Sequence, residues 1–442
     1  MNAAAKVMIV IFLLMLTMPV QALTLNRREH SMTWSRDYGP YIVGGGGNAV
    51  AETLEGGFVL TGVGAGGLVL KLNPVGKPQW ERNYLPEGYV RAEGDSIEQT
   101  NDGGYIVSGQ ALSSHFGYDA WLLRLDREGY AEWSRTFGGT DNDVFHTARL
   151  AHDGGFIIAG NSASIGSGHS FNGWILKVDP EGRVSWQRFF VGQDISSVVP
   201  TRDGGFVAVG TVGVADRAEA WVVKLDSEGG TAWQKAYEVA TRTDAYWVEQ
   251  TSDGGYVLAG DSSFGALVLR LDGTGTVLWA DSLGGGFGIT AHSVQEMHDR
   301  GFIVTGRSLG PQTGPWLARL DAEGNLLWGR YYGGGFDFLF DAFEVSYGTA
   351  RAGERPLRGI VAAGTQLCCG LWLLKLDDNG NVEGCEFPVS SGAWTQIDII
   401  GVEETAQVSL HAGLAGHTTS VLLNTVETTV QEQCPVLPAT DT

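Results

Sequence analysis

The sequence predicts an all-β protein, a seven-bladed β-propeller of four-stranded blades that occupies residues 33–383. A unit of about 50 residues occurs seven times, and a repeat of this length in strand-like sequence is typical of propellers and solenoids. Gly accounts for 65 of the 442 residues without a Gly-X-Y period, and most of it lies in turns. Long amphipathic helical patterns are absent, so the sequence predicts almost no helix.

Each repeat carries three elements. The first is an apolar run after a tight turn, with copies that begin at Glu55, Asp102 (DGGYIVSG), Asp153, Asp203, Asp253, Asp299 and Leu357. The second is an apolar run such as WLLRLD, with copies that begin at positions 68, 121, 174, 221, 267, 316 and 372. The third carries one Trp, at Trp34, Trp80, Trp133, Trp186, Trp233, Trp279 and Trp328. The first two runs are apolar on both faces, which indicates strands with sheets packed on both sides.

The repeat that begins at Asp95 shows how one blade is built. It has room for four strands, SIEQT, GYIVSGQA, AWLLRLD and EWSRTFG. Residues 101–104 and 126–129 supply Gly where a tight hairpin needs positive φ. The sequence therefore predicts a four-stranded meander.

The two ends of the repeat array predict how the ring closes. WSRDYG at 34–39 matches the fourth strand WSRTFG at 133–138, whereas no such strand follows the last WLLKLD run at 372–377. We therefore expect the N-terminal strand to complete the last blade, which removes exposed sheet edges.

Residues 1–22 have the pattern of a cleaved secretory signal peptide. Lys6 precedes an apolar run over 7–18, which is shorter than the ~20 residues of a spanning helix, and Val-Gln-Ala follows. We therefore expect a secreted or periplasmic protein without a membrane span. The net charge of -21 disfavours nucleic acid as a partner, because phosphate backbones repel an acidic protein.

Variable loops are predicted to share one rim of the propeller, where binding usually resides. These loops cover 110–118, 161–172, 211–219, 261–265, 307–315 and 365–370. Acidic residues precede the first strand of several blades on the same rim, at Asp95, Asp143, Asp194, Asp244 and Asp341. One interpretation is a Ca²⁺ site, and the alternative is that each Asp caps its own turn. Aromatic and His residues on this rim are His115, Phe116, Tyr118, His146, His169, Phe171, Tyr246, Trp247 and His292.

Residues 384–442 form a Thr/Val/Ser-rich C-terminal extension. TQIDII, QVSLHA and TSVLLN within it have strand-like patterns, so a short β-rich segment is predicted. Cys385 and Cys434 flank this segment, and in an exported chain we expect them to form a disulfide.

The pattern DGG[YF]I-x-x-G, WLLKLD-x-x-G-x-x-x-W and [YF]GG resembles that of secreted bacterial and archaeal β-propeller repeat proteins. This group is related in pattern to the quinoprotein-like propellers, whose blades interlock through a similar turn that ends in Trp. The resemblance covers residues 34–383 and implies the fold, but no common biochemical function. This chain has seven repeats, whereas the quinoprotein dehydrogenases have eight. None of their cofactor-binding residues can be assigned to a position of this sequence.

Cys368 and Cys369 are adjacent in the predicted loop of the last blade. Three interpretations remain: a vicinal disulfide that stiffens the loop, free or intermolecularly paired thiols, or a cofactor platform. The third follows only from the resemblance, because quinoprotein alcohol dehydrogenases place an adjacent-Cys disulfide against their cofactor.

The sequence thus favours a secreted non-catalytic scaffold that binds a protein, glycan or small-molecule ligand on its variable-loop rim. No cofactor is predicted apart from the Ca²⁺ considered above. The alternative is a quinoprotein-like oxidoreductase that uses the same rim.

Overall fold

The computed structural model describes a β protein whose sheets follow one another around a centre. The described residues are 33–38, 47–114, 117–165, 171–214, 217–284, 288–309, 313–332, 338–347, 357–366, 370–382, 396–398, 402–404, 416–418, 421–425 and 430–432. Every regular element among them is a strand, as predicted. They include no helix long and apolar enough to cross a membrane. The predicted signal peptide and all four cysteines lie outside the described residues.

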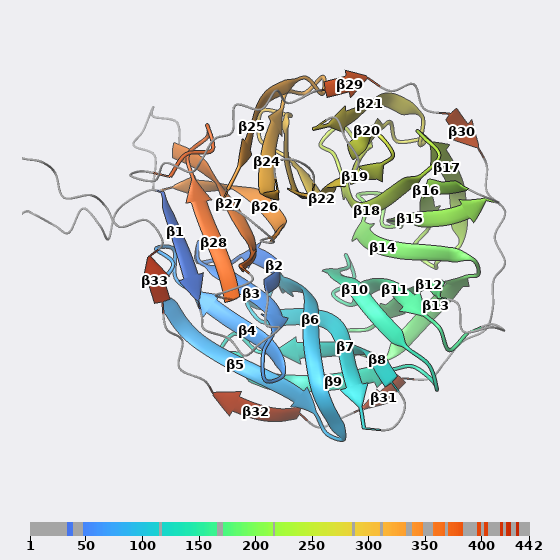
Figure 1. The fold of residues 1–442 in the computed structure, drawn as a ribbon. Helices are drawn as coiled ribbons and strands as arrows, with labels where there is room; N and C mark the ends of the chain where they lie inside the picture. Colours follow the sequence, from blue (N-terminus) through green and yellow to red (C-terminus); the bar gives the residue numbers. More distant parts are fainter. Residues whose placement is uncertain are drawn as a thin grey trace, which may run out of the picture. The chain divides into compact units, whose positions relative to one another are not determined.

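The strands occupy four positions from the centre outward (Figure 1). The inner strands are β2 (Gly47–Glu52), β6 (Tyr89–Gln99), β10 (Asp143–Leu150), β14 (Gln193–Pro200), β18 (Thr243–Gln250), β22 (Ile289–Glu296) and β26 (Phe338–Tyr347). The second strands are β3 (Phe58–Val63), β7 (Tyr105–Ser113), β11 (Phe156–Ser162), β15 (Phe206–Val214), β19 (Tyr256–Ser262), β23 (Phe302–Ser308) and β27 (Leu357–Gln366). The third strands are β4 (Gly67–Leu72), β8 (Gly117–Leu125), β12 (Asn172–Val178), β16 (Arg217–Leu225), β20 (Gly265–Leu271), β24 (Gly314–Leu320) and β28 (Gly370–Leu376). The outer strands are β5 (Pro78–Pro86), β9 (Ala131–Phe137), β13 (Val184–Phe190), β17 (Thr231–Glu238), β21 (Val277–Leu283), β25 (Leu326–Tyr331) and β1 (Trp34–Tyr38).

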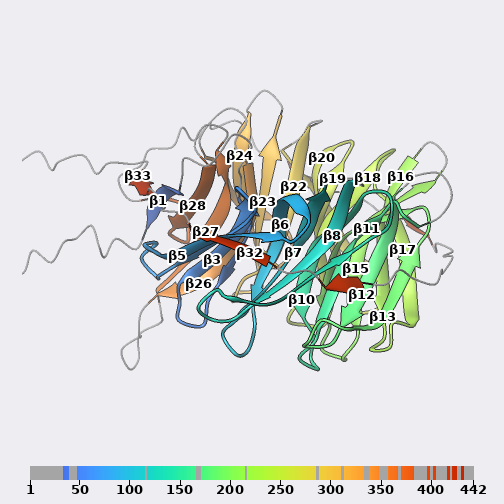
Figure 2. The same ribbon diagram turned by 90° about the horizontal axis from the view of Figure 1, so that it is seen from below.

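Hydrogen bonds join these strands into antiparallel sheets. Two sheets have the simple orders β10-β11-β12-β13 and β22-β23-β24-β25. A ten-stranded sheet contains both β2–β5 and β6–β9, which meet through the single pair of Val63 with Glu93. Each remaining sheet carries a short fifth strand from the C-terminal extension. The described residues therefore form a propeller-like ring of antiparallel meanders, seen from its side in Figure 2.

The N-terminal strand lies where the sequence predicted it. β1 pairs antiparallel with β28, Trp34 facing Lys375 and Tyr38 facing Leu371. Tyr38 is fully buried in a cluster that contains Phe58 of β3 and Leu373 of β28. The first and last sheets therefore share one apolar core.

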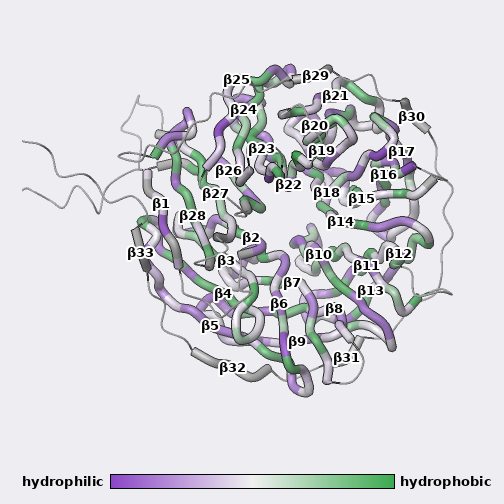
Figure 3. The backbone as a smooth tube through the Cα atoms, in the orientation of Figure 1, coloured by the Kyte–Doolittle hydropathy of each residue, from purple (hydrophilic) through white to green (hydrophobic). Residues whose placement is uncertain are grey.

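Apolar side chains fill the space between neighbouring sheets. β11 and β12 are buried along their whole length, and Figure 3 shows the hydropathy of each strand. Val222 of β16, for example, shares a cluster with Leu258 of β19. Because both faces of such strands are covered, their sequences are apolar on both faces.

Side chains of the outer strands bind the turn of the next sheet, and we call these contacts the latches. Trp186 Nε1 donates to Ser227 O at 3.1 Å, and Arg188 Nε donates to Gly229 O at 3.0 Å. Gly229 has a φ of +77°, and a Cβ there would lie 2.8 Å from the Trp186 ring. Only Gly therefore fits at this position of the turn, beside the Trp ring.

Tyr residues provide the buried latches. Tyr84 donates to Gly129 O at 2.6 Å, and Tyr332 donates to Gly380 O at 2.8 Å. At the closure of the ring, Tyr38 of β1 donates to Gly76 O at 2.7 Å. β1 thus completes the last sheet and also latches onto the first.

A buried cation of the third strand pairs with the acid that opens the DGG motif. Arg124 contacts Asp102 at 2.5 Å, and Lys177 contacts Asp153 at 2.8 Å. In the last sheet Leu357 replaces the acid, and burial lowers the pKa of Lys375 to about 8. The repeated Asp therefore stabilises a buried cation inside its own sheet.

Deletion of residues 23–40 is expected to remove the outer strand of the last sheet and its latch on the first. The exposed edge of β28 should cause aggregation or loss of the cooperative unfolding transition. Differential scanning calorimetry and light scattering measure both effects. A truncated protein that stays monomeric and melts at the wild-type temperature would contradict this role of β1.

Candidate functional site

A β-bulge in the inner strands shapes the centre of the ring. Each pairing of an inner strand with its second strand shifts register at the same place, opposite the last Gly of the repeated motif. At Gly260 a Cβ would lie 1.9 Å from Asp244 O, so only Gly fits. The motif therefore specifies a bulge, which changes the direction of the side chains after it.

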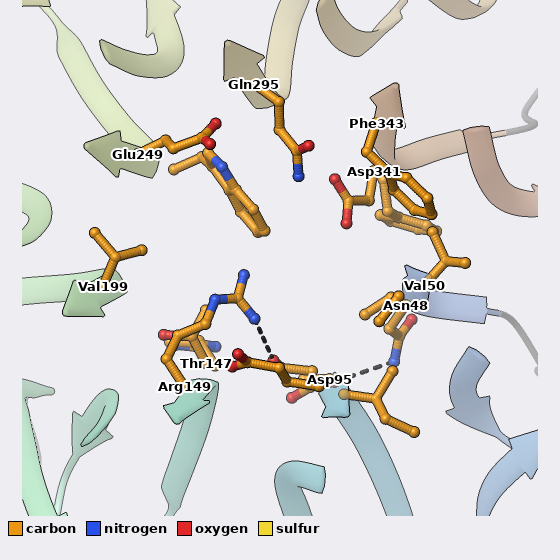
Figure 4. Close-up of a pocket in the computed structure, with 18 of the residues that line it drawn as sticks. Asn48, Val50, Asp95, Thr147, Arg149, Val199, Glu249, Gln295, Asp341 and Phe343 are labelled. Carbon is orange, nitrogen blue, oxygen red and sulfur yellow. Dashed lines mark hydrogen bonds between the residues drawn. The ribbon is translucent and has the colours of Figure 1, made fainter. Parts of the chain in front are cut away.

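The inner strands enclose a pocket of about 460 Å³. Its lining is Asn48, Ala49, Val50, Ala51, Glu52, Asp95, Ser96, Ile97, Glu98, His146, Thr147, Arg149, Val199, Trp247, Val248, Glu249, Gln295, Phe340, Asp341, Phe343 and Glu344. Figure 4 shows Arg149, Gln295 and Asp341 pointing toward one another across it. We call this space the central pocket.

The central pocket has many more acidic than basic side chains. The carboxyl groups are those of Glu52, Asp95, Glu98, Glu249, Asp341 and Glu344, and they come from four inner strands. Arg149 is the one Lys or Arg in the described lining. The pocket therefore favours positively charged ligands.

Arg149 is held at the wall by two neighbours. Its Nη1 donates to Ser96 Oγ at 3.3 Å, and its guanidinium lies 5.0 Å from the centre of the Trp247 ring. Such stacking on an aromatic face stabilises a cation. The wall thus already accommodates one guanidinium against an aromatic ring.

Asp341 is the most buried acid among those that line the pocket. Its side chain is 6% exposed, and its Oδ1 has no hydrogen-bond partner among the described residues. Burial raises the pKa of Asp341 to about 7, although Arg149 and the Ser293 hydroxyl act in the opposite direction. A buried carboxylate oxygen without a donor is energetically unfavourable, so this oxygen is suited to accept one from a ligand.

Burial also raises the pKa of four more acids of the pocket, Glu52, Asp95, Glu98 and Glu249, and most strongly that of Asp95 and Glu249. Burial and repulsion from Glu93 raise the pKa of Asp95 to about 8, although Asn48 Nδ2 donates to its Oδ1 at 3.0 Å. Burial, with repulsion from Glu296 and Asp341, raises the pKa of Glu249 to about 8. The carboxyls of Asp95 and Glu249 are therefore largely protonated near neutral pH, and a bound cation would favour their ionisation.

The five aspartates predicted as a cation site do not form one ring. Asp95 is itself the bulged residue and Asp341 follows the bulge, and both line the central pocket. Asp143, Asp194 and Asp244 lie two or three residues before their bulges and are not among the residues that line it. The described residues contain no group of three His, Cys, Asp or Glu that could hold a metal ion. The Ca²⁺ site stays a prediction.

Two of these aspartates have local hydrogen-bond partners, and Asp244 also binds Thr211 of the neighbouring sheet. Asp143 accepts hydrogen bonds from Gly139 N at 2.9 Å and from Ser164 Oγ at 2.7 Å. Asp244 accepts from Thr211 Oγ1 at 2.9 Å and from Arg242 Nε at 2.5 Å. These contacts agree with the alternative that an Asp caps its local turn.

The predicted aromatic and His residues have different environments. Trp247 and His146 line the central pocket, and burial lowers the pKa of His146 to about 4. Tyr246 donates to Asp261 at 2.8 Å, away from the pocket lining. His115, Phe116 and His169 lie outside the described residues, as do Cys368 and Cys369. No described residue of the predicted variable loops lines the central pocket.

Sequence reasoning missed five charged residues of the pocket, three of which share one position of the repeat. Glu98, Arg149 and Glu249 each stand four residues before the Asp that opens the DGG motif. Val199 and Gln295 occupy the same position in other repeats, so side chains of four types converge there. A polar residue at this one variable position of an apolar strand is the signal that could have identified them.

No protein-family model and no curated protein matches the chain. Among solved structures, a protein of unknown function from Bacteroides caccae has 16% sequence identity and a TM-score of 0.40, covering 61% of this chain and 92% of its own. Sqt1 from Chaetomium thermophilum has 11% identity and a TM-score of 0.47, covering 75% and 85%. A putative gluconolactonase has 13% identity and a TM-score of 0.34, covering 66% and 89%. At these values no family is assigned.

The unfolding free energy of the ligand-free protein is expected to decrease between pH 5 and pH 8. Asp95, Glu249 and Asp341 lose their protons in the folded state only toward the upper end of this interval, because their pKa values are raised to about 7 or 8. In the unfolded chain they ionise near pH 4, so the folded state binds more protons and loses stability as the pH rises. Urea denaturation at a series of pH values measures this slope.

Asp341→Asn removes one of these ionisations without changing the size of the side chain. The variant should be more stable than wild type at pH 8, by about 1–3 kcal/mol, and should show a shallower slope. Glu323→Gln, at an exposed turn residue, is the matched control and should leave the slope unchanged. An Asp341→Asn protein with the wild-type slope would contradict the assignment.

Proposed function

We propose that this protein is a non-catalytic binding scaffold, a seven-bladed propeller whose central pocket binds an organic cation. The observation that carries the proposal is the buried Oδ1 of Asp341, which has no described donor and belongs to a pocket with six carboxyl groups and one Arg. A ligand with ammonium or guanidinium groups would supply the missing donor and the missing positive charge.

Seven blades follow from dividing the ten-stranded sheet into two meanders. β2–β5 and β6–β9 are each joined by consecutive antiparallel pairings, whereas one residue pair connects them. Each meander has its own bulged inner strand and its own latch residues. With this division every blade has four strands, and β1 supplies the fourth strand of the last blade.

The spread of the carboxyl groups favours an extended organic cation over a single metal ion. A metal ion needs several ligands within about 2–3 Å, and the described residues contain no group of three acidic or His side chains that could provide this. An extended cation with two or more charges can reach separate carboxyls. Trp247, Phe340 and Phe343 offer apolar surface for its hydrocarbon part.

The polar contacts of the lining support binding over catalysis. Ser96 Oγ accepts a hydrogen bond from Arg149, and His146 Nε2 contacts Asn161 Nδ2 at 3.2 Å. The described contacts therefore do not pair a hydroxyl with the one pocket His, which is one common arrangement for nucleophilic catalysis. We retain the export predicted from residues 1–22 as part of the proposal.

The test is isothermal titration calorimetry at pH 7.5 with spermidine, the tripeptide Lys-Lys-Lys and calcium chloride. Spermidine or the tripeptide should bind with one site per chain, and the preferred ligand separates a free polyamine from a basic protein segment. Asp341→Asn and Glu249→Gln should weaken binding about tenfold or more, since each removes a charged partner. Glu323→Gln should bind like wild type.

Two outcomes would overturn this proposal. One is the absence of binding by both organic cations at millimolar concentration. The other is tight calcium binding that Asp341→Asn abolishes while the organic cations stay inert, because this would assign the pocket to a metal ion.

A further inference from the structure

The C-terminal extension supplies short strands to the outer edges of several sheets. These strands are β29 (Gln396–Asp398), β30 (Val402–Glu404), β31 (Gly416–Thr418), β32 (Val421–Thr425) and β33 (Val430–Glu432). In this order they pair antiparallel with β21, β17, β9, β5 and β1. The extension therefore follows the outside of the ring, opposite to the order of the sheets (Figure 1). The outer edges of β13 and β25 have no partner strand among the described residues.

The pairings have a regular step of seven residues per sheet. The position used for comparison is the residue two after the Trp of each outer strand. Thr418 faces Arg135, Thr425 faces Arg82 and Glu432 faces Arg36 at this position. One sheet therefore uses seven residues of the extension.

The same step holds at the other end of the extension. Asp398 faces Asp281, which is two residues after Trp279. Glu404 faces Ala236, so the next residue of the extension, 405, corresponds to the position two after Trp233. Residues 398 and 405 are again seven apart.

The interval from 405 to 418 is close to two steps and spans one additional sheet. That sheet is β10–β13, which lies between β14–β17 and β6–β9 in the chain and in Figure 1. If the seven-residue step continues, residue 411 or 412 would be the partner of Arg188 of β13, and residue 391, one step before Asp398, the partner of Arg330 of β25.

We propose that residues 384–434 encircle the ring as a belt whose segments around 411 and 391 also pair with β13 and β25, and whose ends are joined by a disulfide between Cys385 and Cys434. The occupant of both free edges is thus a named part of this chain. Strand addition at these edges would give their backbone groups hydrogen-bond partners and block edge-to-edge aggregation.

Charge complementarity supports the belt. Six of the seven outer strands carry Arg or Lys two residues after the Trp, including Arg188 and Arg330 at the two free edges. Residues 384–434 contain six Asp or Glu and no Lys or Arg. The extension therefore brings a net negative charge to edges that are mostly basic. Glu432 opposite Arg36 is the described pair in which an acid faces this basic position, whereas Asp398 faces the acidic Asp281.

Both ends of the belt reach the last sheet. Val382, at the end of the turn after β28, is buried with Leu376 and Tyr332, and Cys385 follows three residues later. Glu432 faces Arg36, so continued pairing places Cys434 opposite Trp34, which itself faces Lys375 of β28. Three residues of chain span up to about 10 Å, and the belt requires that this reach bring the two Cα atoms within disulfide distance.

The disulfide is tested by mapping the unreduced protein after digestion with a glutamate-specific protease, because the belt has no tryptic site. The peptides 384–386 and 433–442 should be recovered joined and should separate on reduction. Cys385→Ser should lower the melting temperature, because the disulfide no longer restricts a loop of about 50 residues in the unfolded chain. Recovery of Cys385 and Cys434 as free thiols would overturn the closure.

The pairing with β13 is tested by engineered cysteines in a Cys368→Ser, Cys369→Ser background. Arg188→Cys combined with His411→Cys or Ala412→Cys should give an intramolecular crosslink on mild oxidation. Thr136→Cys with His417→Cys, an established pair of β9 and β31, is the positive control. Arg188→Cys with His417→Cys is the negative control.

Hydrogen exchange of the unaltered protein gives a second, mutation-free measurement. The backbone amides of β13 and β25 that do not bond β12 or β24 should be protected to a similar degree as those of β9. Rapid exchange of these amides, with no crosslink from Arg188→Cys while the positive control forms, would overturn the belt.

Discussion

The structure depends on the hydrogen bonds by which outer strands hold the turn of the next sheet, seen at six of the seven described outer strands. Trp186 and Arg188 bind one such turn, Tyr332 binds another, and Tyr38 binds the turn of the first sheet. Each sheet is apolar on both faces, so it is stable only with a neighbour on each side. The latches fix that neighbour and allow the first sheet to meet the last. Glycine in the turn is required because the Trp ring leaves no room for a Cβ.

Ring closure brings together charged residues that would otherwise stay apart. Asp95, Glu249 and Asp341 belong to inner strands far apart in the sequence, and the bulge opposite each motif Gly sets the direction of such side chains. The raised pKa values of these acids show that the ring holds them in an unfavourable environment. The latches and the apolar cores therefore stabilise the fold enough to hold buried acids in a pocket that is suited to a cation. Binding sites commonly contain such unfavourable groups, which the rest of the scaffold stabilises.

The sequence predicted the all-β meanders and the closing strand, because the repeats and Trp34 specify local pairing and turns. It did not predict the central pocket, because Asp95 and Asp341 stand at or just after the bulge whereas Asp143, Asp194 and Asp244 stand before it, and the bulge changes the direction of the side chains that follow. TQIDII contains β29 and TSVLLN overlaps β32, as predicted, and QVSLHA lies outside the described residues. The strands β30, β31 and β33 were missed because short strands on a sheet edge have little sequence signal of their own.

The central claim is that an organic cation binds in the central pocket and that the buried carboxyl groups release protons when it binds. The most direct measurement is the number of protons released on spermidine binding at pH 7.5, obtained by calorimetry in two buffers of different ionisation enthalpy. The account predicts a net release, because the cation favours ionisation of carboxyls that carry protons in the empty pocket. Binding at this pocket without proton release, or with proton uptake, would contradict it.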